Sequence, residues 1–204
     1  MILATLTLED VSVGALKKVN LSVSEGEIVC VSGASGSGKS RLLRAVADLD
    51  PHEGRVALDG ESQDSMPGHV WRRQVMMVPA DSQWWFDDVG SHFGADADRE
   101  VPEALGFGPD VMSWTVSRLS SGERQRLAIL RGLYRNPRVL LLDEPTANLD
   151  DEMTQKVEGW LVSEIRARKL AVIWIAHDNS QIRRIAGRHY RIDGDSLELL
   201  DGNH

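Results

Sequence analysis

The sequence predicts an α/β fold with a mostly parallel β-sheet, an antiparallel β portion and a short helical lobe. Three observations lead to this prediction. Short apolar runs that suit buried strands occur at residues 28–31, 74–78, 139–142 and 170–175. Segments with helical spacing of apolar residues lie between several of these runs, whereas the amino-terminal residues alternate apolar and polar side chains.

The amino-terminal residues suit the antiparallel β portion. Residues 2–13 alternate apolar and polar side chains, and residues 16–23 can form a second strand antiparallel to them. A break at 50–54, which contains a proline and a glycine, comes before residues 55–60. For residues 55–60 we expect a short edge strand.

The stretch from Ala80 to Arg118 has a different composition. Three aromatic residues, Trp84, Trp85 and Phe86, precede a segment that is rich in acidic side chains and has few apolar positions. We expect a small, mostly helical insertion here.

A helix with a marked start follows this insertion. Ser120 and Glu123 have the spacing of a capping box, in which two residues satisfy each other's free backbone N–H groups. Apolar side chains then recur at helical spacing until Asn136-Pro137 ends the helix.

A phosphate-binding loop is the most specific motif of the sequence. It lies between the predicted strand 28–31 and the predicted helix 41–47 and fits the pattern G-x-x-x-x-G-K-S/T. Glycines let backbone N–H groups turn around phosphate oxygens, the lysine adds charge for the outer phosphates, and the last serine can ligate Mg²⁺. We expect the nucleotide to be bound by Gly33, Ala34, Ser35, Gly36, Ser37, Gly38, Lys39 and Ser40.

Two acidic residues follow the most apolar run of the chain. Asp143 and Glu144 come directly after residues 139–142, and open α/β sheets bind ligands at the carboxyl ends of their strands. We expect Asp143 to hold the Mg²⁺ shell and Glu144 to polarise the attacking water. His177 follows the strand 170–175 and emerges at the same edge, which favours a phosphate contact.

Length and composition narrow the function classes. A chain of 204 residues suits one domain with a sizeable core, and it shows neither an apolar run that could span a bilayer nor a signal-peptide pattern. The single cysteine, Cys30, argues against a disulfide framework, favours a reducing cytoplasm and suits a small buried side chain. Because the net charge is -8, we expect no nucleic-acid partner.

Together these motifs resemble those of the nucleotide-binding subunit of an ATP-binding cassette (ABC) protein. The resemblance covers the whole chain, and its five motifs occur in family-like order and spacing. They are the phosphate loop 33–40, the signature-like segment 119–123, the strand and acid pair 139–144, the turn 147–150 and His177.

The resemblance implies a P-loop NTPase core and an ATP hydrolase whose cofactors are ATP and Mg²⁺. It implies one ABC ATPase domain over residues 1–204, with a core lobe at 1–79 and 136–204 and a helical lobe at about 80–135. It also implies that Glu144 and His177 are catalytic.

The resemblance further implies that two copies pair head to tail. Each ATP would lie between the phosphate loop of one copy and the signature of the other, where the nucleotide would be bound by Ser120, Ser121, Gly122 and Glu123. Asp150 would lie on the route between the two sites, and His177 would contact the γ-phosphate.

One departure from the family pattern concerns the metal. Where the family has a glutamine that reaches Mg²⁺ and the attacking water, this chain has Ala80. Either Asp81 or Gln83 substitutes for it, or the site works without that ligand. We favour Asp81, because a carboxylate is a good ligand for Mg²⁺.

Two further departures concern the nucleotide. Val13 stands where the family carries an aromatic side chain that stacks on adenine, which predicts weaker nucleotide binding. In the signature segment Ser121 replaces a glycine and Glu123 replaces a glutamine, so we expect a functional site that is not optimal.

The expected partner is an integral-membrane permease. Trp84 and Trp85 lie where ABC ATPases meet the coupling helices of a permease. These two rings either pack the helical lobe against the core or form an exposed anchor for a partner helix.

Two functional classes remain at this stage. The first is the ATPase subunit of an ABC transporter, cytoplasmic and held on the inner face of the cell membrane by its permease. The alternative is a soluble ABC-type ATPase of a cytosolic assembly machine, similar to the one in iron–sulfur cluster assembly.

Overall fold

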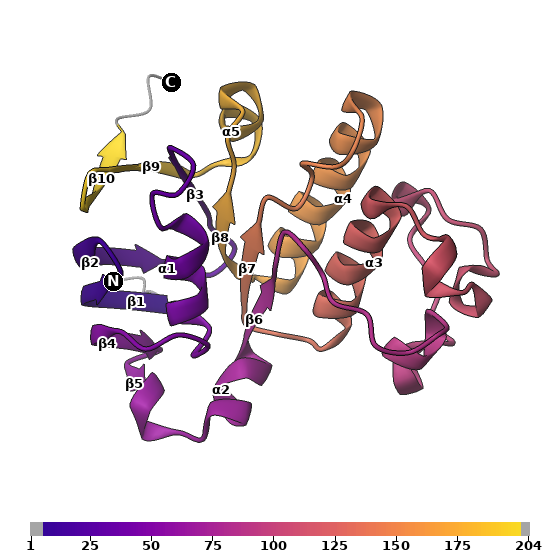
Figure 1. Cartoon of the computed structure of the whole chain (residues 1–204), viewed down its shortest axis with the longest axis horizontal. Helices are drawn as coiled ribbons and strands as arrows, with labels where there is room; N and C mark the ends of the chain where they lie inside the picture. The colour runs from indigo at the N-terminus through magenta and orange to yellow at the C-terminus, as the bar shows by residue number, and fades with distance from the viewer. Residues whose placement is uncertain (1–5, 201–204) are drawn as a thin grey trace.

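The computed structural model describes residues 6–200, which form two β-sheets with helices between and beside them (Figure 1). The part of the first predicted strand that precedes Leu6 lies outside the described residues. Among the described residues, no helix combines the length and apolar character needed to cross a membrane.

The smaller sheet is antiparallel, with the strand order β2-β1-β4-β5. Its strands are β1 (Leu6–Val13), β2 (Leu16–Val23), β4 (Glu53–Leu58) and β5 (Glu61–Ser62). The predicted pairing of the first two strands is confirmed. The strand predicted in residues 55–60 is present as part of β4, but its predicted place at the edge of the sheet is wrong, because the two-residue β5 pairs with the outer side of β4. A hairpin turn at Asp59-Gly60 brings β5 back along β4.

The larger sheet has the strand order β10-β9-β3-β8-β7-β6. Its neighbours are parallel except for the terminal hairpin of β9 and β10. The central strands β7 and β8 are buried at every position, as predicted from their apolar runs. Its strands are β3 (Ile28–Gly33), β6 (Val75–Val78), β7 (Val139–Asp143), β8 (Ala171–Ile175), β9 (Arg188–Asp193) and β10 (Ser196–Leu200).

The helices form two layers around this sheet. Helix α1 lies between the two sheets, and α3 and α4 cover the opposite face of the larger sheet (Figure 1). Helix α2, which the sequence did not reveal, leads into the edge strand β6. The helices are α1 (Lys39–Val46), α2 (Gly68–Gln74), α3 (Ser121–Tyr134), α4 (Asp151–Arg168), α5 (Asn179–Ile185) and the short 3-10 turn η1 (Gln63–Ser65).

Residues 80–118 are not mostly helical, so that prediction is wrong. The helical elements of this described segment are single 3-10 turns, and between residues 90 and 109 glycine or proline recurs too often for an α-helix to continue. An isolated antiparallel bridge joins Asp88 to Thr115. Four of the segment's apolar side chains are buried in the hydrophobic core that α3 and α4 form with the larger sheet, namely Val89, Phe93, Leu105 and Val111. The turns are η2 (Gly90–His92), η3 (Gly94–Asp96), η4 (Glu103–Leu105), η5 (Val111–Ser113) and η6 (Val116–Arg118).

Cys30 lies in the middle of β3 and is fully buried in the hydrophobic core between the larger sheet and helices α3 and α4. Burial, with a smaller contribution from the charge of Glu158, raises the pKa of its thiol to about 12. Cys30 therefore packs as a small apolar side chain, as its position in the apolar run predicted.

Candidate nucleotide-binding site

The phosphate loop joins the carboxyl end of β3 to the start of α1. Gly33 has a φ of 150°, and a Cβ on it would lie 2.9 Å from Ser37 Oγ and 3.1 Å from the carbonyl oxygen of Ile192. Gly38 has a φ of 99° and directly precedes the helix. Glycine is therefore needed at both positions, at the first because the loop closes tightly and at the second because of its left-handed backbone. The loop residues Ala34, Ser35 and Gly36 are exposed.

Lys39 folds back over this loop. Its Nζ donates to the carbonyl oxygens of Gly33 and Ala34 at 3.0 and 2.9 Å, and the residue is only 6% exposed. The ammonium group is thus held inside the loop by polar atoms. A phosphate bound by the loop would meet a positive charge that is already in place.

Asp143, at the end of β7, has the features of a metal ligand. It is 5% exposed, and its Oδ1 is buried without a hydrogen-bond partner. Burial raises the pKa of this carboxyl, and the neighbouring Glu144 acts in the same direction, while hydrogen bonding from Ser40 and the charge of Lys39 oppose the rise. A carboxylate oxygen left free beside a serine hydroxyl fits Mg²⁺, which prefers oxygen ligands.

Glu144 and His177 meet at the carboxyl edge of the larger sheet. Strands β7 and β8 are parallel neighbours that pair Asp143 with Ile175, so the two residues emerge side by side. His177 Nε2 lies 2.7 Å from Glu144 Oε1. Because an ionised carboxylate only accepts hydrogen bonds, His177 carries the donated proton on Nε2. Both side chains border a cavity of about 230 Å³.

The predicted signature segment forms the capping box at the start of α3. The backbone N–H and the hydroxyl of Ser120 each donate to Glu123 Oε2 at 2.8 Å, and the backbone N–H of Glu123 donates to Ser120 Oγ at 3.2 Å. The hydrogen bond from the Ser120 N–H leads the effects that lower the pKa of Glu123. Ser121 is exposed beside them.

The signature segment packs against the turn that Asp150 ends. A Cβ on Gly122 would lie 2.8 Å from the carbonyl oxygen of Asn148, so only glycine permits this approach. Asp150 is exposed and caps α4 by accepting a hydrogen bond of 2.8 Å from the N–H of Met153. Two segments far apart in the sequence thus form one continuous surface.

Asp81 lies apart from the Glu144–His177 cavity. It is exposed, and it borders a different cavity of about 780 Å³ that also contacts Trp84, Trp85 and Phe86. Its role as a metal ligand remains a prediction.

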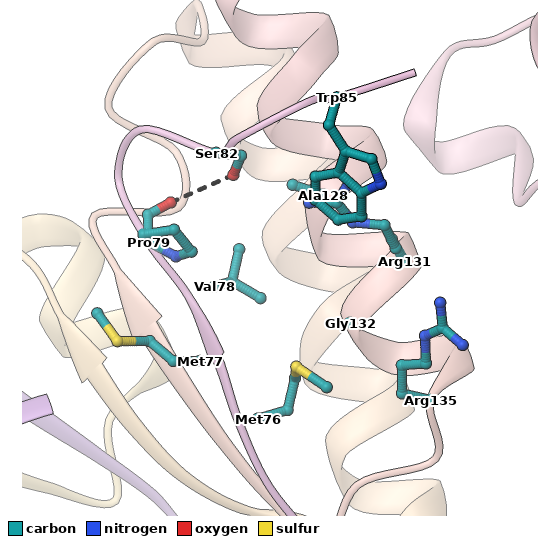
Figure 2. A pocket seen from close by; sticks show the side chains of 10 residues that line it. All are labelled: Met76, Met77, Val78, Pro79, Ser82, Trp85, Ala128, Arg131, Gly132 and Arg135. Carbon is teal, nitrogen blue, oxygen red and sulfur yellow. Dashed lines mark hydrogen bonds between the residues drawn. The ribbon is translucent and has the colours of Figure 1, made fainter. Parts of the chain in front are cut away.

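The two tryptophans have different environments. Trp84 is half-buried, and the guanidinium of Arg131 lies 4.5 Å from its ring centroid. Trp85 is 65% exposed and leans over α3 at the end of a groove of about 220 Å³ (Figure 2). The groove runs between β6 and α3 and is lined by apolar side chains and two arginines, Arg131 and Arg135.

Two buried polar residues near these sites, His92 and Gln181, were not predicted from the sequence. His92 is 2% exposed, and its Nε2 accepts hydrogen bonds from the backbone N–H groups of Trp85 and Phe86 at 2.9 and 3.0 Å. Gln181 is buried and borders the same cavity as Glu144 and His177. Neither residue belongs to a motif. The one signal in the sequence is that Gln181 follows His177 by four residues.

The fold and the phosphate loop together define a nucleotide-binding α/β domain. Comparison with known proteins shows to which family this domain belongs. The family model described as "ABC transporter" matches residues 16–147. This chain belongs to the ABC transporter family and represents its ATP-binding domain.

Two curated relatives illustrate the similarity. The Fe(3+) ions import ATP-binding protein FbpC of Streptomyces coelicolor is 38% identical over 187 residues, covering 85% of this chain and 53% of the relative. The probable iron export ATP-binding protein FetA of Escherichia coli is 30% identical, covering 82% of this chain and 80% of the relative. This chain therefore spans about half the length of the first relative.

Solved structures share the fold. A bacterial Atm1-family ABC exporter with ATP bound superposes with a TM-score of 0.82 at 25% identity, over 97% of this chain and 39% of that chain. CbiO1 of Clostridium perfringens, part of the ABC transporter complex cbiONQ, superposes with a TM-score of 0.79 at 24% identity, over 95% and 86%. The α/β fold with its antiparallel portion is thereby confirmed.

Proposed function

We propose that this chain is the ATP-hydrolysing subunit of an ABC transporter and that it powers a separate membrane permease. The observation that supports this most strongly is the contact between Glu144 and His177. Glu144 directly follows the buried Asp143 after β7, His177 follows β8, and the phosphate loop follows β3 at the same sheet edge. The two named relatives are import and export ATP-binding proteins, which favours transport over cytosolic assembly.

In this proposal each residue has a defined task. The backbone of the loop 33–40 and Lys39 hold the phosphates, and Glu144 accepts the proton of the attacking water. His177 donates to Glu144 through Nε2 and fixes the orientation of its carboxylate at 2.7 Å. Asp143 and Ser40 would hold Mg²⁺, which supplies positive charge to the phosphate oxygens when it is bound.

The second copy of the chain is a proposed partner. The exposed positions Ser120 and Ser121 and the exposed Asp150 lie on one surface, because Gly122 packs against Asn148. We propose that this surface faces the phosphate loop of the other copy, so that ATP joins the two. Closure and reopening of this dimer would then follow ATP binding and hydrolysis.

The permease would dock in the groove between β6 and α3, at the inner face of the membrane. Trp85 supplies an exposed aromatic anchor, and Arg131 supplies a charge whose Nη1 is buried without a partner. Burial is also the main cause that lowers the pKa of Arg131. A partner helix with apolar side chains and one carboxylate would complement this groove.

The proposal is tested by ATP turnover of the purified chain with Mg²⁺. Replacing Glu144 by Gln removes the proton acceptor but keeps the shape, so we expect turnover to fall by about a hundredfold or more. ATP binding, followed by calorimetry, should stay within about threefold of the wild-type value.

A matched control is Glu152→Gln, which changes an exposed carboxylate at the start of α4 that pairs with Lys156. It should leave turnover unchanged. Absence of turnover in the wild-type chain, or substantial turnover by Glu144→Gln, would contradict the proposed function.

A further inference from the structure

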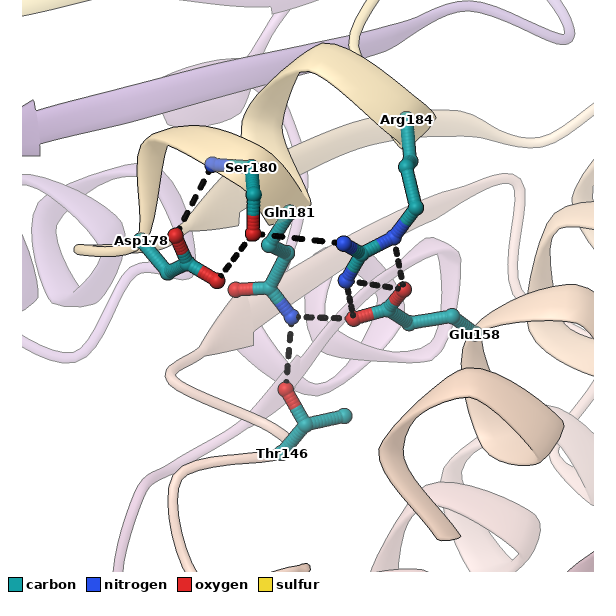
Figure 3. Close-up of polar contacts among 6 residues, drawn as sticks. All are labelled: Thr146, Glu158, Asp178, Ser180, Gln181 and Arg184. Carbon is teal, nitrogen blue, oxygen red and sulfur yellow. Dashed lines mark hydrogen bonds and ion pairs between the residues drawn. The ribbon is translucent and has the colours of Figure 1, made fainter. Parts of the chain in front are cut away.

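A polar cluster joins α4, α5 and the loop after β7 (Figure 3), and some of its members border the same cavity as Glu144 and His177. The proposed function gives it no task, yet three of its side chains are among the most buried polar groups of the described chain. Its members are Thr146, Glu158, Asp178, Ser180, Gln181 and Arg184.

Gln181 is at the centre of the cluster. Its Nε2 donates to Thr146 Oγ1 and to Glu158 Oε1, both at 2.7 Å. An amide nitrogen has two hydrogens, so both are used. Thr146, Glu158 and Gln181 are 7%, 4% and 7% exposed. Because the Glu158 carboxylate only accepts, the nitrogen of the amide must face it, which fixes the orientation of the side chain.

Glu158 ties this amide to α4 and α5 together. Its carboxylate accepts hydrogen bonds from Nε and Nη2 of Arg184 at 3.1 and 3.0 Å. A buried carboxylate is costly unless it is paired and fully hydrogen-bonded, and Arg184 and Gln181 together meet that need. Arg184 also donates to Ser180 Oγ, which in turn donates to Asp178, the cap of α5.

The cluster holds the two segments that carry the catalytic pair. Thr146 lies two residues after Glu144, whose φ of 48° is a strained backbone conformation for a residue other than glycine. His177 lies in the loop after β8, and Gln181 follows four residues later in α5. The side chains of His177 and Glu144 are 49% and 32% exposed, so surface packing alone does not fix their contact.

We propose that Gln181 is a positioning residue that keeps Glu144 and His177 in register by binding Thr146 on one side and Glu158 on the other. Gln181 borders the same cavity as the pair, and in this proposal it acts through its hydrogen bonds and not on the substrate. It fixes the distance between the loop after β7 and the loop after β8, and thereby the direction in which Glu144 presents its free oxygen. This inference rests on the proposed function of Glu144 and His177.

The first test replaces Gln181 by Glu or Met in the full chain. Glu keeps the shape but places a carboxylate against Glu158, and Met removes both donors. We expect kcat for ATP to fall by about tenfold to a hundredfold, as for a misplaced catalytic group. KM for ATP should stay within about twofold, because the phosphate loop is untouched.

The second test is a rescue. In Gln181→Glu combined with Glu158→Gln, the amide and the carboxylate exchange places beside Arg184, and the Thr146 hydroxyl can donate instead of accept. We expect this double variant to recover most of the lost kcat. Arg183→Ala, an exposed change on the same helix, should leave kcat unchanged.

A spectroscopic readout separates positioning from loss of stability. Nitrogen-15 NMR of the histidine rings should show His177 protonated at Nε2 in the wild-type chain and as a mixture of tautomers in Gln181→Met. Unchanged kcat and an unchanged His177 tautomer in both single variants, with an active wild-type chain, would overturn the inference. If Glu144→Gln were as active as wild type, the proposed function itself would fail.

Discussion

At the scale of single residues, the site is defined by two buried charged side chains, Asp143 and Lys39, with different hydrogen-bonding states. Asp143 Oδ1 has no partner although it is buried, whereas Lys39 already uses the loop carbonyls. Such an arrangement favours a ligand that supplies positive charge to Asp143 and negative charge to Lys39. Magnesium bound to a nucleotide phosphate is such a ligand.

One prediction at this scale concerns the ligands of Mg²⁺. Ala80 has no side-chain oxygen and cannot bind the metal, so another residue has to supply that ligand if it is needed. If Asp81 substitutes, Asp81→Ala should raise the Mg²⁺ concentration needed for half-maximal ATP turnover by about tenfold. Asp87→Ala, another exposed carboxylate of the same segment, serves as the control. An unchanged Mg²⁺ dependence in Asp81→Ala, together with faster turnover in Ala80→Gln, would show that the assignment to Asp81 is wrong.

At the scale of elements, close backbone approaches set the shape of the smaller sheet. Strand β1 changes register against β4 between Glu9 and Ser12, and Asp10 has a φ of 50° at this bulge. Gly54 faces the bulge, and a Cβ on it would lie 2.4 Å from the carbonyl oxygen of Asp10. No side chain fits between these two backbones.

Gly54→Ala should therefore lower the free energy of unfolding by about 3 kcal/mol or more. Gly60→Ala is a matched control, because Gly60 has nearly the same φ, 82° against 81°, and a Cβ on it would meet nothing within 4 Å. It should cost only about 1 kcal/mol from backbone strain. Equal losses in urea unfolding would show that the contact with Asp10 is unimportant.

The loop before α3 gives a prediction on pH. His92 donates from Nδ1 to the carbonyl oxygen of Asp88 and accepts two backbone N–H groups at Nε2, so it must be neutral. Burial is the main cause that lowers the pKa of His92. The charge of Arg131 lowers this pKa further, and Asp88 raises it. The folded state then binds fewer protons than the unfolded state just below the ordinary histidine pKa of about 6.5.

The contribution of His92 to stability is thus present above pH of about 6.5 and is lost as the pH falls toward its lowered folded pKa. We expect urea unfolding to show a larger loss of stability between pH 7.5 and 5.5 in the wild-type chain than in His92→Gln. The pKa of His189 is also lowered, first by burial, and it contributes equally to both proteins. Identical pH profiles would contradict the neutral state inferred for His92.

At the scale of the whole molecule, the groove between β6 and α3 ends at Trp85, which belongs to the aromatic loop of residues 84–86 (Figure 2). Pro79 and Ser82 line this groove, and both are joined to α3 through Gln125, which donates to the Pro79 carbonyl oxygen and accepts from Ser82 Oγ. A partner in the groove would therefore contact the segment that follows β6 as well as the exposed Trp85.

The partner is sought with tagged Glu144→Gln protein, ATP and Mg²⁺ in detergent-solubilised membranes of the source cells. We expect a polytopic membrane protein to co-purify in near-stoichiometric amount and Trp85→Ala to reduce its recovery by about tenfold or more. Leu199→Ala, which removes an exposed apolar side chain of β10, should not reduce recovery. Recovery of soluble proteins alone would favour the cytosolic assembly alternative.

Much of this arrangement was predictable from local patterns. The loop 33–40, the buried strand before Asp143 and the capping box of Ser120 and Glu123 each depend on residues within a few positions of one another. The insertion at 80–118 was mispredicted, since scattered apolar residues did not reveal that its turns pack as separate pieces on α3 and α4. Strand β6 was correctly placed, but its position at the edge of the sheet depends on strand order.

The sequence by itself determined the phosphate loop, the buried strands β3, β7 and β8 and the capped helix α3, because side-chain periodicity and backbone preference act over a few residues. It did not determine α2, β5 or the turns of residues 80–118. It also determined that Lys39, Asp143 and Glu144 lie at one edge of the sheet, because parallel strands end on the same side. Only the tertiary structure decided that His177 bonds Glu144, that Gln181 bridges Thr146 and Glu158, and that His92 holds the aromatic loop. The bonds of His177 and Gln181 join different elements of the chain and depend on packing, which no short stretch of sequence specifies.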